Sequence, residues 1–182
     1  MAENAIIING KKRRQRVEVF AVNKDDMILV AEKGYTAYPE LPGGGVDIGE
    51  SLVSAGMREL AEEAGWLAID PKVMELPDQY IFSGKDDGWF NRDNWNEEEN
   101  IAIVCTAIRF EPTKAYGSED DHLQFTLIPI KKLIKNIEEF LLSDCTERKK
   151  VNATFRLAIL KKILLDNSEQ IKNSPTWTSW SK

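Results

Sequence analysis

The chain has 182 residues, of which 42% are hydrophobic and 30% are charged, and its formal net charge is −6. This size and composition fit one domain with a sizeable core, and they exclude collagen-like, disordered and membrane-spanning classes. The acidic balance argues against general nucleic-acid binding, because the phosphate backbone would be repelled. The chain does not open with a secretory signal pattern, so a cytoplasmic protein with reduced cysteines is expected.

The N-terminal part of the chain predicts three strands. Ile6–Ile8 and Arg16–Val22 are rich in β-branched residues, and an Asn-Gly pair followed by the basic run Lys11–Arg14 separates them. We expect the basic run to be a solvated turn or a guard on an edge strand, with contact to substrate phosphates or RNA as the alternative. A third strand, Met27–Ala31, is expected to pair with the second through the polar turn Asn23–Asp26.

A glycine-rich turn follows the third strand. Gly43, Gly44 and Gly45 come directly after a Leu-Pro pair, and glycine lets the backbone adopt positive φ and approach a bulky or charged group. We therefore expect these three residues to cradle a ligand. Tyr38 precedes the turn, and its ring either stacks on a nucleobase or packs against the turn itself.

The next segment predicts a helix with well-marked ends. Ser51 is the expected N-cap and Gly65 the expected residue after the C-terminus, so the helix should run from Leu52 to Ala64. Apolar residues recur within it at helical spacing and predict a buried stripe. The members of this stripe are Val53, Met57, Leu60 and Ala64.

Three acids of this helix stand at i, i+3 and i+4 and crowd one side of it. They are Glu59, Glu62 and Glu63, and each like-charged pair destabilises a helix by roughly 0.2–0.5 kcal/mol. Arg58 offsets part of that repulsion if it holds one of the carboxylates. Clustered carboxylates beside a backbone carbonyl are the ligands that Mg²⁺ prefers, so the pattern indicates a metal site; a solvated acidic face is the alternative.

The segment after the helix predicts further strands and one long loop. Leu67–Ile69 and Val73–Phe82 are expected to be extended, and Ile101–Phe110 is nearly all apolar, which is typical of a central buried strand. The loop Ser83–Asn100 lies between them and carries Trp89 and Trp95 beside basic residues. These aromatic residues either stack on a base or cover the sheet.

The C-terminal part predicts one strand and two helices. The strand is Leu123–Pro129, and the helices are Ile130–Leu142 and, approximately, Lys149–Leu165, both with apolar faces that should cover the core. The polar tail 167–182 contains two tryptophans and is expected to be either mobile or docked on this chain or on a second copy. A homodimer is therefore left open.

The glycine turn and the acidic helix together resemble the signature of the Nudix hydrolase family. That signature is Gly, five residues, Glu, seven residues, then Arg-Glu-aliphatic-any-Glu-Glu-any-Gly-aliphatic, and a match at so many fixed positions is far more specific than a lone glycine motif. The last position departs, because an aromatic residue stands where an aliphatic one is usual. The matching residues are Gly44, Glu50, Arg58, Glu59, Leu60, Glu62, Glu63 and Gly65, and the departing residue is Trp66.

The resemblance implies a fold and a reaction. The fold would be an α/β protein of the Nudix-type α/β/α sandwich with a mixed central sheet, formed by residues 1–166 with 167–182 as the tail. The reaction would be hydrolysis of a nucleoside diphosphate linked to another moiety, with Mg²⁺, or Mn²⁺ in its place, as cofactor. The partner would be a small nucleotide-type substrate, either a nucleoside triphosphate or an ADP-ribose or nucleotide-sugar compound.

The resemblance also implies site residues. Metal ligands would be the carbonyl of Gly44 and the carboxylates of Glu59, Glu62 and Glu63, and Arg58 would orient a carboxylate. Either Glu59 or Glu119, in the acidic run downstream, would serve as general base. Two other readings remain open at this point, an RNA-end pyrophosphohydrolase for caps or triphosphates, and a nucleotide-binding sensor on the same fold.

Overall fold

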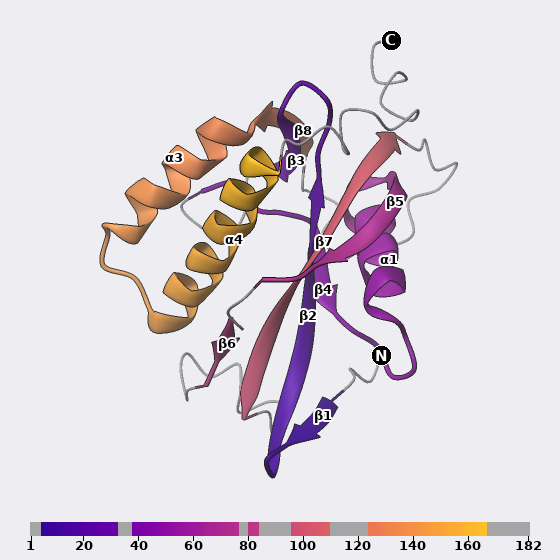
Figure 1. Cartoon of the computed structure of the whole chain (residues 1–182), viewed down its shortest axis with the longest axis vertical. Helices are drawn as coiled ribbons and strands as arrows, with labels where there is room; N and C mark the ends of the chain where they lie inside the picture. Colours follow the sequence, from indigo (N-terminus) through magenta and orange to yellow (C-terminus); the bar gives the residue numbers. More distant parts are fainter. Residues whose placement is uncertain (1–4, 33–37, 77–79, 84–95, 110–123, 167–182) are drawn as a thin grey trace.

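The computed structural model describes residues 5–32, 38–76, 80–83, 96–109 and 124–166. Within these ranges the chain forms strands and helices in mixed order, and Figure 1 shows their arrangement. The strands are β1 (Ala5–Ile8), β2 (Lys11–Ala21), β3 (Met27–Ala31), β4 (Gly43–Gly45), β5 (Trp66–Met74), β6 (Ile81–Phe82), β7 (Glu97–Arg109) and β8 (Phe125–Pro129). The helices are α1 (Leu52–Ala64), α3 (Ile130–Leu141) and α4 (Glu147–Leu165).

The centre of the fold is a mixed sheet with strand order β1-β2-β7-β5. β2 and β7 run parallel over nine residue pairs, whereas β1 and β4 pair antiparallel with β2, and β5 and β6 pair antiparallel with β7. α1 covers one face of this sheet, and α3 and α4 cover the other (Figure 1). The α/β sandwich with a mixed central sheet predicted from the sequence is therefore confirmed.

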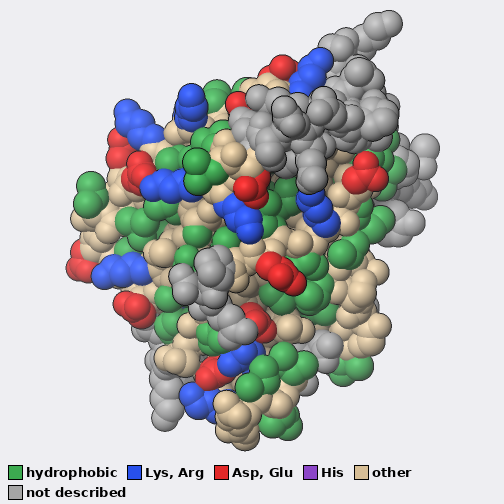
Figure 2. Space-filling view, viewed as in Figure 1, with side chains coloured by type: hydrophobic (Ala, Val, Ile, Leu, Met, Phe, Trp, Pro, Cys, Tyr) green, Lys and Arg blue, Asp and Glu red, His purple; other side chains and the backbone are tan. Residues whose placement is uncertain are grey.

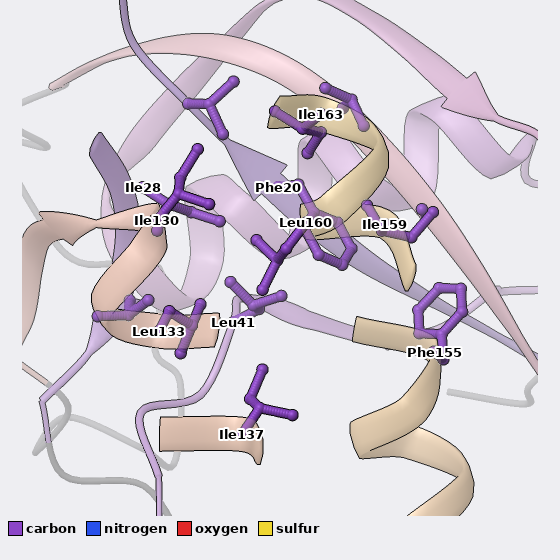
Figure 3. Packing of buried hydrophobic residues seen from close by; sticks show 14 of the residues in the cluster. Phe20, Ile28, Leu41, Ile130, Leu133, Ile137, Phe155, Ile159, Leu160 and Ile163 are labelled. Atoms are coloured by element: carbon purple, nitrogen blue, oxygen red, sulfur yellow. The ribbon is translucent and has the colours of Figure 1, made fainter. Parts of the chain in front are cut away.

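Two apolar cores separate the sheet from its helices. Alternate residues of β2 point to opposite faces, so Phe20 faces α3 and α4, whereas Val19 faces α1. Figure 3 shows the first core, in which α4 residues Ile159 and Leu160 close over Phe20. Each buried side chain of this size contributes roughly 1.5–3 kcal/mol, so both faces of the sheet need their helices.

The prediction for β3 was wrong in its pairing partner. Met27–Ala31 is a strand as expected, but it pairs antiparallel with β8 in a separate two-stranded sheet. Its link to β2 is a single bridge between Val22 and Ile28. The polar turn does return the chain antiparallel for this one bridge, and Asn23 N–H donates to Met27 O at 3.0 Å, but the strand then leaves the main sheet. Its pairing with β8 joins segments about one hundred residues apart, which local pattern does not reveal.

The basic run Lys11–Arg14 was also misread, because it lies inside β2 and not in a turn. Arg13 donates to Glu97 Oε2 from Nε at 2.9 Å and from Nη2 at 2.7 Å, and both side chains are buried. On the neighbouring rung Arg14 Nη1 lies 3.5 Å from Glu98 Oε2, which Arg148 of α4 also contacts at 2.9 Å. We refer to these residues, with Lys11 and Glu99, as the β2–β7 charge ladder.

Two further expectations are corrected, one by this strand pairing and one by the packing of α1. Glu97–Asn100, expected at the end of a long loop, form the first rungs of β7, because β2 extends far enough to pair with them. On α1, Met57 of the predicted stripe is 43% exposed, while Gly56 and Leu60 face the sheet. A Cβ on Gly56 would lie 2.8 Å from Ile103 Cγ1, so the missing side chain lets α1 approach β7 on that side.

The expected segments Leu67–Ile69 and Val73–Phe82 are divided differently, because β5 runs without a break from Trp66 to Met74 and β6 contains only Ile81–Phe82. The C-terminal helices and the long apolar strand agree closely with the sequence. The two C-terminal helices lie where the apolar spacing placed them, and β7 is the central buried strand. Both cysteines are free thiols, with Cys105 buried in β7. Of the described helices, none combines the length and apolar character that crossing a bilayer requires. The predicted tail 167–182 lies outside the described residues.

Candidate active site

The ends of α1 fix the positions of the acidic residues. Ser51 accepts a hydrogen bond from the backbone N–H of Ser54 at 3.1 Å and so caps the first turn. Gly65 has φ 67°, and its N–H donates back into the last turn of the helix. Both predicted caps are confirmed, and the helix runs from Leu52 to Ala64 as the sequence indicated. These caps set which carboxylates face the glycine turn.

Arg58 is the centre of a cluster of carboxylates. Its Nε and Nη2 each lie 3.0 Å from an oxygen of Glu50, which makes a bidentate ion pair. Its Nη1 donates to Glu59 Oε1 at 2.6 Å and to Glu62 Oε2 at 3.2 Å, and Nη2 also donates to the carbonyl of Gly45 at 2.9 Å. We name Arg58 with Glu50, Glu59 and Glu62 the Arg58 cluster. One cation is thus hydrogen-bonded to three acids, a fourth acid, Asp47, lies 4.0 Å from its Nε, and negative charge is in excess.

The environments of two acids in the cluster differ. Burial raises the pKa of the Glu59 carboxyl above its ordinary value, and the hydrogen bond and charge of Arg58 oppose this only in part. The hydrogen bonds from Arg58 instead lower the pKa of Glu50, which is less buried. Two carboxylates on one arginine are therefore pushed in opposite directions. Perturbed carboxyl groups of this kind are typical of functional sites.

The register of β4 on β2 decides which glycine carbonyls face outward. Val19 N–H donates to Pro42 O at 2.8 Å, and Val46 N–H donates to Gln15 O at 3.1 Å. Because antiparallel pairs alternate, Val17 and Gly44 form the hydrogen-bonded pair between them, and the polar backbone groups of Gly43 and Gly45 point away from β2. The outward edge of the turn is therefore made by Gly43 and Gly45.

Side chains from both faces of the sheet meet this outward edge at Gly43. The N–H of Gly43 donates to Glu63 Oε2 at 2.8 Å, which links the turn to α1. The carbonyl of the same residue accepts a hydrogen bond from Arg16 Nη2 of β2 at 3.3 Å. The structure thus brings the glycines close to Glu59 and Glu63 of the acidic helix. The expectation of a turn with positive φ is wrong, because the three glycines form strand β4 and none of them has positive φ. The substrate and metal roles of these residues stay predictions.

The contact between Gly44 and Glu59 tests whether a metal ion suits this site. A Cβ on Gly44 would lie 2.3 Å from Glu59 Oε1, so only glycine lets the carboxylate lie against the turn. Carboxylates beside backbone carbonyls are the oxygen donors of a hard divalent cation, and in that chemical sense the residues fit. Among the described residues no three acids stand close enough to hold a metal ion as they are. Ligation would require them to exchange their present partners for the cation.

Tyr38 does not lie where stacking on a base would need it. Its side chain is 5% exposed, its ring makes an edge contact with Phe140, and its hydroxyl accepts a hydrogen bond from Arg156 at 3.1 Å. The structure therefore gives the ring a packing role in the core and corrects its assignment to substrate binding. Glu119, Trp89 and Trp95 lie outside the described residues, and their assigned roles stay predictions.

Sequence reasoning missed three charged residues near the turn. Glu18 of β2 is fully buried and receives two hydrogen bonds from Arg156 of α4, at 2.7 and 2.6 Å. Arg16 Nε lies 3.8 Å from the same carboxylate. A signal was present, because an acid between Val17 and Val19 in an apolar strand requires a buried partner. The partner is 138 residues away and cannot be found from local pattern.

Comparison with known proteins agrees with this geometry. The profile of the NUDIX domain matches residues 12–144. An RNA pyrophosphohydrolase of Wolbachia pipientis subsp. Culex pipiens is 30% identical over 152 positions, with 74% of this chain and 93% of the relative covered. An RNA pyrophosphohydrolase of Ruthia magnifica subsp. Calyptogena magnifica is 30% identical over 122 positions, covering 58% and 68%.

The fold also has solved counterparts. A crystal structure of an ADP compounds hydrolase superposes with a TM-score of 0.53 at 20% identity, covering 86% of this chain and 75% of that protein. At 20% identity, this structural similarity supports the fold alone. Together with the match of the family profile over more than half of the sequence, these findings show that the chain belongs to the Nudix family, whose enzymes hydrolyse pyrophosphate bonds.

Proposed function

We propose that the chain hydrolyses the phosphoanhydride bond of a small nucleotide, either a nucleoside triphosphate or an ADP-ribose or nucleotide-sugar compound. The observation that carries this proposal is the Arg58 cluster beside the outward edge of the glycine turn. Acids outnumber the cation there, so the site is suited to a divalent cation and, through it, to a pyrophosphate group. The family generally uses a divalent metal such as Mg²⁺.

The residues that would hold the cation are Glu59, Glu62 and Glu63, together with an outward carbonyl of the turn. The sequence favoured the carbonyl of Gly44, whereas the register of β4 favours that of Gly43, which points away from β2. A bound divalent cation would supply charge neutralisation on the phosphate oxygens and acidification of the attacking water. Substitution of any one ligand should therefore reduce turnover strongly.

Two side chains of the cluster have roles that do not involve binding the metal: Arg58 as a positioning residue, and Glu59 as a general base, which is the alternative to its role as a ligand. Arg58 fixes the carboxylates of Glu50 and Glu59 by direct hydrogen bonds, so it positions them without reaching the substrate. Glu59 has a raised pKa because it is buried, which brings its proton affinity closer to that of a general base working near neutral pH. Glu119 remains the alternative base predicted from the sequence.

A second candidate is hydrolysis at the 5′ end of RNA, and the names of the two relatives favour it. The charge distribution opposes it. Of the run Lys11–Arg16, which would form a backbone groove, Arg13 and Arg14 are already paired with Glu97 and Glu98 in the β2–β7 charge ladder. On the face drawn in Figure 2, basic and acidic side chains are interleaved among the described residues instead of forming one basic surface. We therefore place small nucleotides first.

The decisive experiment measures release of phosphate, pyrophosphate and nucleoside monophosphate from a panel of substrates with Mg²⁺. The panel contains nucleoside triphosphates, ADP-ribose, a nucleotide sugar and an RNA with a 5′-triphosphate. Glu63→Gln is assayed in parallel, and we expect it to lose at least about 100-fold in kcat/KM, since it removes a charged ligand in a site governed by electrostatics. Glu138→Gln on α3 is the matched control, because its carboxylate is half exposed and pairs with Lys161.

The outcomes separate the alternatives clearly. One preferred small nucleotide, hydrolysed by the native protein and the control but not by Glu63→Gln, supports the proposal. Preference for the RNA, with kcat/KM falling steeply as salt rises, would select the second candidate instead. If no substrate is hydrolysed but nucleotides still bind, the proposed hydrolysis is contradicted, and a nucleotide-binding sensor on the same fold becomes the favoured function.

A further inference from the structure

Arg16 lies on the face of the sheet opposite α1 yet reaches the same turn as the acidic helix. It shares its face of β2 with Glu18 and Phe20, which contact Arg156 and Phe155 of α4. Its guanidinium extends along the sheet to the carbonyl of Gly43, and its side chain keeps 25% of its surface exposed. The group is therefore held in place by the protein and still accessible from outside.

The charge of Arg16 is not neutralised by its nearest acid. The carboxylate of Glu18 is fully buried and makes two short hydrogen bonds to Arg156, and the strong attraction of Arg156 outweighs burial and lowers the pKa of Glu18. Arg16 stands at 3.8 Å from that carboxylate, in a looser contact. Glu18 therefore lies between two arginines, of which Arg16 is the more exposed and the more loosely held. Among the described residues, Glu18 is the acid paired with Arg16.

The peptide group of Gly43 joins this cation to the acidic site. Glu63 binds the N–H of Gly43 from the α1 side, and Arg16 binds its carbonyl from the α4 side. A ligand lying along the outward edge of the turn would therefore meet acids at one end and a guanidinium at the other.

We propose that Arg16 binds a phosphate group of the substrate on the α4 side of the glycine turn. This rests on the proposed function, since a pyrophosphate compound must occupy the turn. A guanidinium offers paired N–H donors that match phosphate oxygens, so Arg16 exchanges its long bond to the Gly43 carbonyl for shorter, charge-assisted bonds to phosphate. The pair of Glu18 and Arg156 positions Arg16 and does not touch the substrate.

The test compares Arg16→Gln and Arg16→Lys with the native protein in two measurements. The first is the dissociation constant of adenosine 5′-(α,β-methylene)diphosphate by calorimetry, with Mg²⁺ and again with a chelator. The second is kcat and KM on the preferred substrate of the panel. For Arg16→Gln we expect both the dissociation constant and KM to rise about tenfold, with kcat changed much less, because a phosphate contact made in ground and transition states is uniform binding.

The lysine variant and one control separate binding from a merely structural role. Arg16→Lys keeps the charge and should recover part of the affinity, whereas loss of a structural contact to Gly43 should lower kcat in both variants and leave the dissociation constant unchanged. Lys131→Gln, which removes one charge from an exposed position on α3, should change neither quantity.

Two results would overturn the inference. If the native protein hydrolyses a nucleotide but Arg16→Gln leaves both the dissociation constant and KM unchanged, the phosphate contact does not exist although the proposed function stands. If the native protein binds no methylene analogue under either condition, the turn holds no phosphate group and the inference fails with its premise. If instead binding is present and weakened in Arg16→Gln while hydrolysis is absent, the proposed function alone fails.

Discussion

Two arginines on opposite faces of the sheet show how burial separates a closed ion pair from an open and shared one. Arg156 in α4 is 5% exposed and pairs with one acid, Glu18, in a closed contact of two short hydrogen bonds. Arg58 in α1 has 23% of its side chain exposed and is shared among three acids of the Arg58 cluster. The first group is balanced and dry, and the second has unbalanced charge at the surface.

The difference has a physical cause. Ions in the interior require complete pairing, because desolvation of each ion costs several kcal/mol, so a buried pair leaves no capacity for another ligand. A cluster with excess carboxylate beside a backbone edge retains that capacity. We conclude that the Arg156 pair stabilises the fold near the turn, and that the Arg58 cluster is the place where a cation and a substrate are expected.

The largest expected effect comes from opening the buried pair. Glu18→Gln leaves Arg156 without its counter-ion in the interior, and we expect a loss of roughly 3–5 kcal/mol in the free energy of unfolding. Equilibrium urea denaturation measures this loss. A double variant, Glu18→Leu with Arg156→Met, removes both charges and should be much closer to the native stability. A loss below 1 kcal/mol for Glu18→Gln would show that the two regions do not differ as argued.

The next effect concerns the exposed cluster and should appear in turnover, not in stability. Arg58→Lys keeps a positive charge but cannot hold Glu50 and Glu59 with a planar fork, so kcat/KM should fall roughly 10- to 100-fold, as for residues that orient metal ligands. The free energy of unfolding should change by about 1 kcal/mol or less, since the pairs are partly hydrated. Paired kinetics and urea denaturation decide the point, and a stability loss as large as that of Glu18→Gln would refute it.

The β2–β7 charge ladder should make the stability of the fold depend on pH in the acid range. Hydrogen bonds from Lys11 and then Arg13 lower the pKa of Glu97 below its ordinary value of 4.5. Since the folded pKa is the lower one, the stabilisation is present above pH 4.5 and is lost as pH falls through the folded pKa. In Glu97→Gln, the free energy of unfolding should therefore decrease less on acidification than in the native protein. Urea denaturation at several pH values measures this difference. An unchanged slope would mean that other acids dominate.

The sequence was sufficient wherever structure depends on neighbours along the chain. The ends of α1 were predicted because Ser51 and Gly65 act within one turn of the helix, and the pairing of Arg58 with Glu62 follows from their i, i+4 spacing. Most of the candidate site could therefore be predicted from the sequence, since most of its side chains come from one helix and one glycine segment. The direction of its backbone carbonyls could not be predicted, because it depends on the register of β4 on β2.

Long-range pairing explains what was missed. The basic run was read as solvated because its acidic partners lie 84 residues away, and only the parallel pairing of β2 with β7 places Arg13 beside Glu97. For Tyr38, stacking on a base stayed open beside packing because its partner Arg156 lies 118 residues away. A charged or aromatic residue taken alone appears available, and its true environment is set by a strand or helix from elsewhere in the chain.

An exposed ion pair on α3 should contribute least to stability and serves as the reference for the buried pair. Lys135 and Glu139 stand one turn apart on α3, with their charged atoms 3.7 Å apart and their side chains 75% and 63% exposed. Water solvates both charges whether or not they pair, so Glu139→Gln should change the free energy of unfolding by less than about 0.5 kcal/mol, and that change should vanish in high salt. The same urea experiment used for Glu18→Gln measures it. If Glu139→Gln were as destabilising as the buried variant, exposure would not be the property that separates the Arg156 pair from the Arg58 cluster.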